Sequence, residues 1–252
     1  MRIALVTQNE TVFLPSALDY LLRRLPASAE VAACIILSGS SVRGNSAIKK
    51  AINLARIFGP YFVLRNGLVH AYRTMSGYTI EGIAKDHQIS IIQLSRGINH
   101  PDSLSQISDL DLDILINIAG AEIFRKKLID LPRICTLNLH TSKLPHYRGM
   151  LPSFWVMLND ETETAVSVFA VDEGIDTGPV LAQLPLKIKG LSQAQLIRLT
   201  KHMGMDAIVL ALDSLGRGRQ IEYVEKEGVG SYYSFPTRAD VKRFRQMGKR
   251  FF

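Results

Sequence analysis

Long apolar runs, cysteine pairs and metal-binding spacings are all missing from this sequence. No apolar run reaches the ~18 residues that span a bilayer, although 47% of the 252 residues are hydrophobic. The two cysteines, Cys34 and Cys135, sit among apolar residues without C-x-x-C spacing, and the six histidines form no H-E-x-x-H pattern. We therefore expect buried free thiols, no metal and no membrane contact. The chain starts with apolar strand residues in place of signal-peptide zones, so we expect a reducing cytoplasmic location.

Two further absences narrow the chemistry. The first predicted strand-to-helix turn, residues 6–11, contains no glycine, so it lacks the G-x-G-x-x-G cradle for a pyrophosphate. This argues against a nicotinamide oxidoreductase. Asn9 in this turn is left either to cap the helix or to contact an acceptor. No Ser or Cys lies in a recognisable nucleophile elbow, so the attacking group is expected to belong to a substrate.

Alternating strand and helix patterns predict an α/β protein with a Rossmann-like, doubly wound, mostly parallel sheet. Residues 30–37 form a near-continuous apolar run, which is typical of a parallel strand covered on both faces. A basic, partly helical stretch that includes Arg43 is expected over residues 38–78. The other expected strands are 2–7, 89–94, 111–119, 134–140, 165–171 and 180–188, and the other expected helices are 13–25, 122–128, 153–158 and 192–216.

The residues with the clearest chemical meaning are Asn138 and His140. Side chains two apart on a strand project from the same face, so an amide donor and an imidazole would point to one place. Together they can hold a developing oxyanion. Asp176, in the loop Asp172-Glu173-Gly174-Ile175-Asp176-Thr177-Gly178-Pro179, could orient the imidazole, favour its charged form or carry a proton. Gly174 and Gly178 beside it would permit a close approach to a ligand or a positive φ.

The order of these motifs resembles the folate-dependent formyltransferases, the family of methionyl-tRNA formyltransferase, glycinamide ribonucleotide transformylase and the nucleotide-sugar N-formyltransferases. The resemblance is strongest over residues 112–186, where N-x-H, S-x-L-P, R-G and the aspartate loop follow one another. It implies catalytic positions for Asn138, His140 and Asp176. It also implies that the pterin of 10-formyltetrahydrofolate binds at Glu122, Ile123, Phe124, Arg125, Ala170, Val171 and Asp172. By composition alone, Ile123 and Phe124 would serve equally well as core residues.

The resemblance further implies formyl transfer to an amine. The glycine-free turn departs from the phosphate loop of the glycinamide ribonucleotide enzymes, and 252 residues leave no room for the C-terminal barrel of the tRNA enzymes or a hydrolase regulatory domain. We therefore expect a small-molecule amine acceptor, with or without phosphate, such as an amino-sugar nucleotide or another amino metabolite. The alternatives are methionyl-tRNA formyltransferase-like activity, formyltetrahydrofolate hydrolysis, and a non-catalytic folate- or RNA-binding protein.

The C-terminal segment carries a concentrated positive charge. We expect a catalytic domain over residues 1–218 and a basic extension over residues 219–252, where residues 238–252 hold six Lys and Arg against the single acid Asp240. The segment could bind phosphates of an acceptor or, less favoured, RNA. We favour a helix that docks through Val241, Phe244, Met247 and Phe251. The preceding Tyr232 and Tyr233 could line an acceptor pocket or a contact in a homo-oligomer.

Overall fold

The computed structural model describes residues 1–37, 47–217 and 223–252, so Arg43 and the predicted boundary at residues 218 and 219 lie outside the described residues. The strands are β1 (Arg2–Gln8), β2 (Glu30–Leu37), β3 (Ser90–Leu94), β4 (Ile114–Asn117), β5 (Cys135–His140), β6 (Arg148–Gly149), β7 (Glu163–Ala170), β8 (Val180–Lys187) and β9 (Tyr232–Tyr233). The helices are α1 (Leu14–Leu22), α2 (Ala47–Phe58), α3 (Pro60–Met75), α4 (Ile80–Asp86), α5 (Pro101–Ser108), α6 (Lys126–Ile129), α7 (Pro152–Leu158), α8 (Gln193–Gly216) and α9 (Arg238–Gln246). None of the helices in these ranges combines the length and the hydropathy that a membrane crossing requires.

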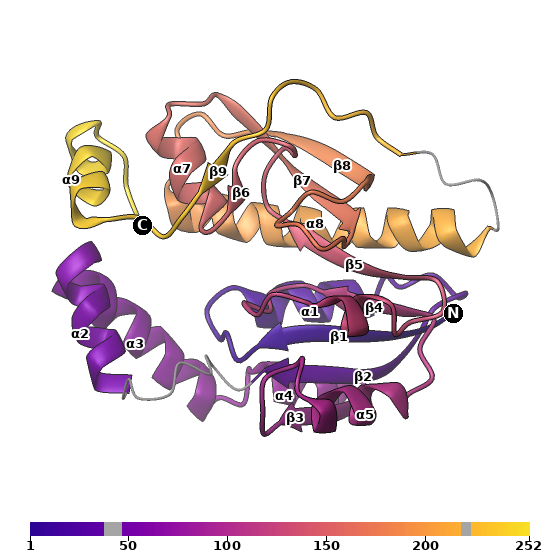
Figure 1. The fold of residues 1–252 in the computed structure, drawn as a ribbon. Coiled ribbons are helices and arrows are strands. Elements are labelled where there is room, and N and C mark those ends of the chain that lie inside the picture. Colours follow the sequence, from indigo (N-terminus) through magenta and orange to yellow (C-terminus); the bar gives the residue numbers. More distant parts are fainter. Residues whose placement is uncertain (38–46, 218–222) are drawn as a thin grey trace.

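A seven-stranded sheet organises the molecule (Figure 1). Its order is β3-β2-β1-β4-β5-β7-β8; the first five strands are parallel, β7 pairs antiparallel with β5, and β8 pairs antiparallel with β7. This confirms the predicted Rossmann-like, mostly parallel sheet. The strand order reverses beside β1, so the carboxyl ends of β1, β4 and β5 meet at the point where open α/β sheets bind ligands.

Both faces of the sheet are covered. One face, which includes Leu5, Ile116 and Leu139, is packed against α1, α4 and the long helix α8. The opposite face, with Val6 and Leu115, is packed against α5 and α6. Side chains of β5 alternate between these faces. Leu137 and Leu139 point toward α8, so Thr136, Asn138 and His140 point to the opposite face.

The expected C-terminal docking helix exists. Val241 and Phe244 of α9 are fully buried with Phe154 of α7, and the rings of Phe154 and Phe244 stack with centroids 4.9 Å apart. Met247 is 38% exposed, so its predicted docking role is wrong: it is the C-cap residue of α9 and lies beyond the helical positions that Val241 and Phe244 occupy. The Arg245 guanidinium donates to the Phe58 carbonyl at the end of α2, and Lys249 pairs with Asp160. Two of the basic side chains of the tail are thus bound to the body, whereas the division into two domains stays a prediction.

Several predicted boundaries are wrong for local reasons. The strand over residues 111–119 is shortened to β4, since Asp111 has a positive φ of 50°. The helix over residues 122–128 is reduced to α6, because Arg125 is extended and Asn99 ties it into a loop. Helix α1 begins at Leu14 and its first amides are bound by Glu10, so Asn9 is not the cap; Asn9 donates to Glu81 instead.

The cysteines are free thiols, as predicted. Cys34 is buried and Cys135 partly exposed. Burial raises the pKa of Cys34 to about 12 and the pKa of Cys135 to about 11, so neither provides a ready thiolate near neutral pH.

Candidate active site

Asn138 and His140 lie on the same face at the carboxyl end of β5, as the alternation predicts. Asn138 is the register partner of Asn117 on β4 and Phe169 on β7, and His140 faces Ser167 on β7. The Asn117 carboxamide donates to the Gly120 carbonyl and accepts from the Gly120 amide. Within the described ranges the Asn138 carboxamide has no hydrogen-bond partner, and the residue is only partly buried. An unpaired amide at the sheet switch point is free to bind a ligand.

The structure brings His140 and Asp176 together. The imidazole Nδ1 lies 3.6 Å from Asp176 Oδ2, and both side chains are largely buried. The Nε2 atom lies 2.8 Å from the Tyr147 carbonyl, which can only accept, so this nitrogen carries a proton. A doubly protonated ring would direct an N–H toward each acceptor, which makes the carboxylate a suitable partner for a charged imidazole.

Asp176 is fixed by the loop that follows β5. Its Oδ2 accepts a 2.8 Å hydrogen bond from the Gly149 amide, and the residue itself has a left-handed φ of 53°. Gly149 has φ of 93°, and a Cβ there would lie 2.3 Å from the Tyr233 carbonyl. Only glycine lets the chain pass at this point while its amide holds the carboxylate.

Two polar residues that the sequence patterns did not single out hold the same loop, the buried Ser167 and the partly buried Gln183. Ser167 Oγ donates to the Ser142 carbonyl at 2.7 Å and accepts from the Leu144 amide and from Gln183 Nε2. Gln183 also donates to the Leu144 carbonyl at 3.2 Å. The sequence gives little indication of this role. Ser167 and Gln183 are polar residues inside strands, and the alternation of polar and apolar residues alone predicts that such side chains face solvent.

The C-terminal segment is part of this loop rather than a separate surface. Strand β9 pairs in parallel with β6, and Ser231 bonds to Tyr147 and Arg148. The Tyr233 ring stacks between those of Tyr147 and Trp155, at centroid distances of 5.3 and 4.8 Å. Burial, followed by a hydrogen bond to Glu161, raises the pKa of Tyr147, so its hydroxyl stays neutral. Tyr233 therefore packs against the loop after β5, a role that neither prediction included, and Tyr232 is 52% exposed beside it.

The two glycines of the aspartate loop serve a different purpose from the one expected. Neither has a positive φ; a Cβ on Gly174 would lie 1.9 Å from Thr177 Oγ1, and one on Gly178 would lie 1.7 Å from the Ala170 carbonyl. The close contacts of these glycines are therefore with Thr177 of the same loop and with Ala170 at the end of β7. Asp172 accepts hydrogen bonds from Gly174 N and Thr177 Oγ1, so its carboxylate shapes the loop.

The segment from Glu122 to Arg125 has no regular secondary structure, and it is tied to the turn before α5. Glu122 accepts from the Ile98 amide, and Asn99 donates to the Ile123 carbonyl and accepts from the Arg125 amide. Phe124 is a core residue, as its composition allowed, whereas Ile123 is 65% exposed. Ala170 and Val171 lie on the other side of β5, with Val171 N donating to the Thr136 carbonyl. Val171 also packs against the cluster that contains Phe124, which links the two expected pterin-binding segments.

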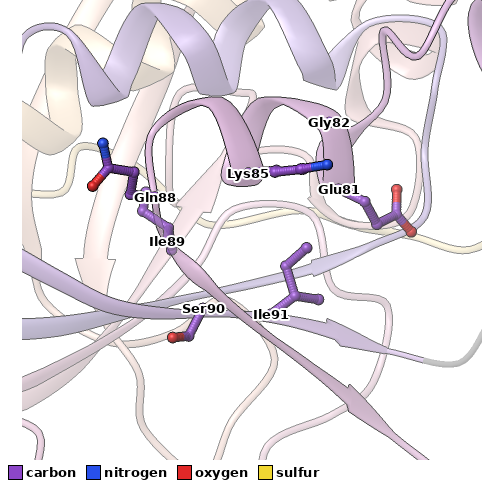
Figure 2. Close-up of a pocket in the computed structure, with 7 residues that line it drawn as sticks. All are labelled: Glu81, Gly82, Lys85, Gln88, Ile89, Ser90 and Ile91. Atoms are coloured by element: carbon purple, nitrogen blue, oxygen red, sulfur yellow. The ribbon is translucent and has the colours of Figure 1, made fainter.

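One hollow of the described surface lies away from this site. A shallow hollow between α4 and the edge strand β3 is lined by Glu81, Lys85, Gln88 and Ile91, and none of the expected site residues borders it (Figure 2). No group of three or more His, Cys, Asp or Glu side chains in the described ranges could hold a metal ion.

Comparison with known proteins places the whole site within one family. The family model described as formyl transferase matches residues 83–212, just over half of the chain, which include all the predicted site residues. Methionyl-tRNA formyltransferase of Geobacter sulfurreducens is 30% identical over 155 residues, 61% of this chain and 48% of the relative. The chain thus spans about half the length of the curated relatives it matches.

Solved structures agree on the fold. Glycinamide ribonucleotide transformylase 1 from Symbiobacterium toebii superposes with a TM-score of 0.60 at 15% identity, over 87% of this chain and 89% of that one. A sugar N-formyltransferase from Shewanella sp FDAARGOS_354 superposes with a TM-score of 0.58 at 15% identity, over 97% and 87%. With the N-x-H strand and the aspartate loop inside the matched region, the chain belongs to the folate-dependent formyltransferase family.

Proposed function

We propose that this protein transfers a formyl group from 10-formyltetrahydrofolate to an amine of a small molecule. The observation that carries the proposal is the unpaired Asn138 carboxamide on the same strand face as His140, whose buried imidazole faces Asp176 at 3.6 Å. These three groups supply two oxyanion donors and a carboxylate beside one of them.

The segments expected to hold the folate suit a flat, partly apolar ring. Asn99 bonds to the Ile123 carbonyl and to the Arg125 amide, so residues 123–125 do not join helix α6. Ile123 presents an apolar side chain to solvent. We assign pterin binding to Glu122, Ile123, Phe124, Arg125, Ala170, Val171 and Asp172. Phe124 and Asp172 contribute through the backbone, because the ring of Phe124 is in the core and the carboxylate of Asp172 is bound within its loop.

The donor supplies the formyl carbon, and the side chains of this protein stabilise the charge that develops on the formyl oxygen. Asn138 donates its free N–H. His140 Nδ1 lies 3.6 Å from Asp176, longer than a hydrogen bond, so its N–H can donate to the formyl oxygen while Nε2 stays on the Tyr147 carbonyl. Each such donor is worth about 10²- to 10³-fold in rate. Asp176 orients the imidazole and accepts the proton that the attacking amine loses. The Gly149 amide keeps the carboxylate in place as it does so. The bond between the formyl carbon and N10 of the donor then breaks, N10 takes up a proton, and tetrahydrofolate leaves.

Glu10 bears on the choice of acceptor. Its carboxylate accepts from the amides of Val12, Phe13 and Leu14, so the positive end of α1, beside the strand switch point, is already neutralised. A phosphate would meet a carboxylate there. This supports an acceptor recognised elsewhere, for which the exposed Tyr232 offers an aromatic surface: its ring lies against Gly149, the residue that anchors Asp176.

A second candidate acceptor is methionyl-tRNA, since the curated relatives are named methionyl-tRNA formyltransferases. Their similarity covers about half of their length, and Tyr232, the residue that we assign to the acceptor side, is aromatic rather than basic. The small amine therefore stays the leading proposal.

A panel of acceptors tests the proposal. The full chain is incubated with 10-formyltetrahydrofolate and amino-sugar nucleotides, hydroxylated amino acids, glycinamide ribonucleotide or methionyl-tRNA, and formylated product is measured. We expect formylation of a small amine. Formylation of methionyl-tRNA alone would favour the second candidate, and release of free formate without an acceptor would identify a hydrolase. Absence of both reactions would favour a binding protein.

Tyr232 gives the acceptor side its own test. Tyr232→Ala should raise the acceptor KM about tenfold, as expected for a lost stacking surface, while the folate KM stays within a few fold. Tyr223→Ala is a matched control, because Tyr223 is 53% exposed and lies outside the catalytic loop. Equal effects of both variants on the acceptor KM would remove Tyr232 from the acceptor site.

A further inference from the structure

Helix α3 has no fully buried residue, and five of its apolar side chains are largely exposed. One of the five, Tyr61, also meets the Phe252 ring edge-on at a centroid distance of 6.0 Å. Tyr61, Leu64, Leu68, Tyr72 and Met75 are 62–88% exposed. Their spacing of three and four residues puts them within about 100° of arc on one helix face. Exposed leucines, tyrosines and a methionine in one continuous stripe are typical of a surface that binds a protein or a membrane. We call these five residues the α3 stripe.

The other side of α3 explains why the stripe faces outward. Phe62 stacks on Phe58 at a centroid distance of 4.8 Å, and the Arg65 guanidinium lies 3.9 Å from the Phe252 ring centroid. His70 Nδ1 and Thr11 Oγ1 are 2.8 Å apart. These contacts fix the helix on the body. Figure 1 shows the α2–α3 hairpin at one side of the molecule, next to α9.

The hairpin carries charge of only one sign. Residues 47–76 contain Lys49, Lys50, Arg56, Arg65 and Arg73, and no aspartate or glutamate. A two-fold contact between copies of this chain through α3 would therefore place two positively charged hairpins against each other, and neither hairpin sequence contains an acidic residue. The face is also small: a 16-residue helix is ~24 Å long and about 10 Å wide, well below the ~800 Å² per partner of a stable dimer. Self-association fits neither the charge nor the area.

Nucleic acid fits the outward face equally poorly. The centre of the stripe is aliphatic, with Leu64 and Leu68, and these side chains neither bind phosphate nor stack on bases. The two arginines of α3 are engaged with rings of the protein: Arg65 lies over Phe252, and Arg73 lies 4.7 Å from the Tyr78 ring centroid. An acid-free basic hairpin with an apolar outer face, and a tyrosine at the start and near the end of its stripe, matches the surface of an anionic bilayer.

We propose that the α3 stripe docks this protein on an anionic phospholipid surface, with α3 lying in the plane of the interface. The leucines enter the boundary between headgroups and acyl chains, and the net positive charge of the hairpin sequence favours an anionic surface over a neutral one. This revises the expectation of no membrane contact, because the absence of a spanning run excludes only a crossing. Through His70 and Thr11 the hairpin contacts the segment after β1, so docking holds the candidate site close to the membrane. The inference does not depend on the proposed activity.

Vesicle flotation of the full chain tests this proposal. The vesicles are pure phosphatidylcholine, or phosphatidylcholine with about one third phosphatidylglycerol. We expect binding to the anionic vesicles, weak binding to the neutral ones, and a loss of at least about tenfold in the double variant Leu64→Glu and Leu68→Glu. The matched control is Leu199→Glu with Leu210→Glu, two exposed leucines of α8, which should bind like the unaltered protein.

Four outcomes would overturn the proposal: no vesicle binding, equal binding to both vesicle types, an α3 variant that binds normally, or a control variant that loses binding as well. Sedimentation velocity without lipid provides the remaining comparison. A dimer that the α3 variant abolishes would assign the stripe to a second copy of the chain, and a tRNA complex that the variant abolishes would assign it to RNA. Thermal unfolding at the same temperature for both variants would show that each is folded.

Discussion

Ser167 Oγ donates a 2.7 Å hydrogen bond to the Ser142 carbonyl, directly across the strand pair from His140. The same hydroxyl accepts from Leu144 N and Gln183 Nε2, so one buried atom joins β7, β8 and the start of the catalytic loop. Ser142 Oγ in turn donates to the Tyr147 carbonyl, the acceptor of His140 Nε2. The position of the imidazole therefore depends on a hydrogen-bond chain that touches no substrate.

Ser167→Ala should lower kcat about tenfold with little change in either KM, because the loop would lose its anchor while the binding segments stay intact. Leaving buried partners unsatisfied also costs about 1–3 kcal/mol, so unfolding should be followed alongside initial rates. Ser214→Ala, an exposed serine of α8 that bonds only to its own helix, is the control. A raised KM with unchanged kcat would contradict a positioning role.

The two aspartates of the loop should behave differently. Asp176→Asn keeps an oxygen for the Gly149 amide but removes the charge beside His140, so turnover should fall about 10²-fold. Asp172→Asn keeps an oxygen for Gly174 N and Thr177 Oγ1 and should change turnover by only a few fold. Initial rates of the two variants across neutral pH decide between them. A larger loss in the Asp172 variant would mean that the wrong aspartate has been assigned to the chemistry.

Sequence patterns predicted the parts of this molecule that follow from local periodicity. The common face of Asn138 and His140 comes from strand alternation, and the capping box of α8 comes from Ser192 and Gln195. The proximity of Asp176 followed from the family resemblance, since 36 residues of chain give no local signal. Tertiary contacts prevent the helix expected over residues 122–128 from starting at residue 122. The Asn99 side chain accepts from the Arg125 amide, and the helix begins only at Lys126.

The missed residues share a physical cause. Glu10 precedes α1 by four residues and reaches its first amides from a loop, outside the usual cap position. Ser167 and Gln183 are polar residues within strands, and alternation cannot distinguish a buried anchor from a solvated side chain. The pairing of β9 with β6 joins segments more than eighty residues apart and has no sequence signature.

The basic tail offers a test of docking against ligand binding. Arg245→Glu should lower the unfolding temperature by about 2–4 °C, because the guanidinium binds the last carbonyl of α2 and lies over Phe251. Arg243→Glu, on the exposed side of α9, should leave unfolding nearly unchanged and is the matched control. Calorimetry of both variants, with acceptor kinetics in parallel, measures this. A raised acceptor KM in both variants with unaltered unfolding would instead favour phosphate binding by the tail.

Asn138→Ala tests the central claim most directly, because Asn138 has an accessible carboxamide with no partner in the described chain, so its loss should affect chemistry and leave the fold intact. Asn117→Ala, the neighbouring position in the β4–β5 register, is the control: its carboxamide bonds to Gly120, so the fold should suffer more than turnover. The measurement is kcat for formyl transfer at saturating substrates, together with the Kd for 10-formyltetrahydrofolate. We predict that Asn138→Ala lowers kcat by about 10²-fold or more while the folate Kd changes by only a few fold. Near-normal kcat in a folded Asn138→Ala protein would contradict the assignment of this site to formyl transfer.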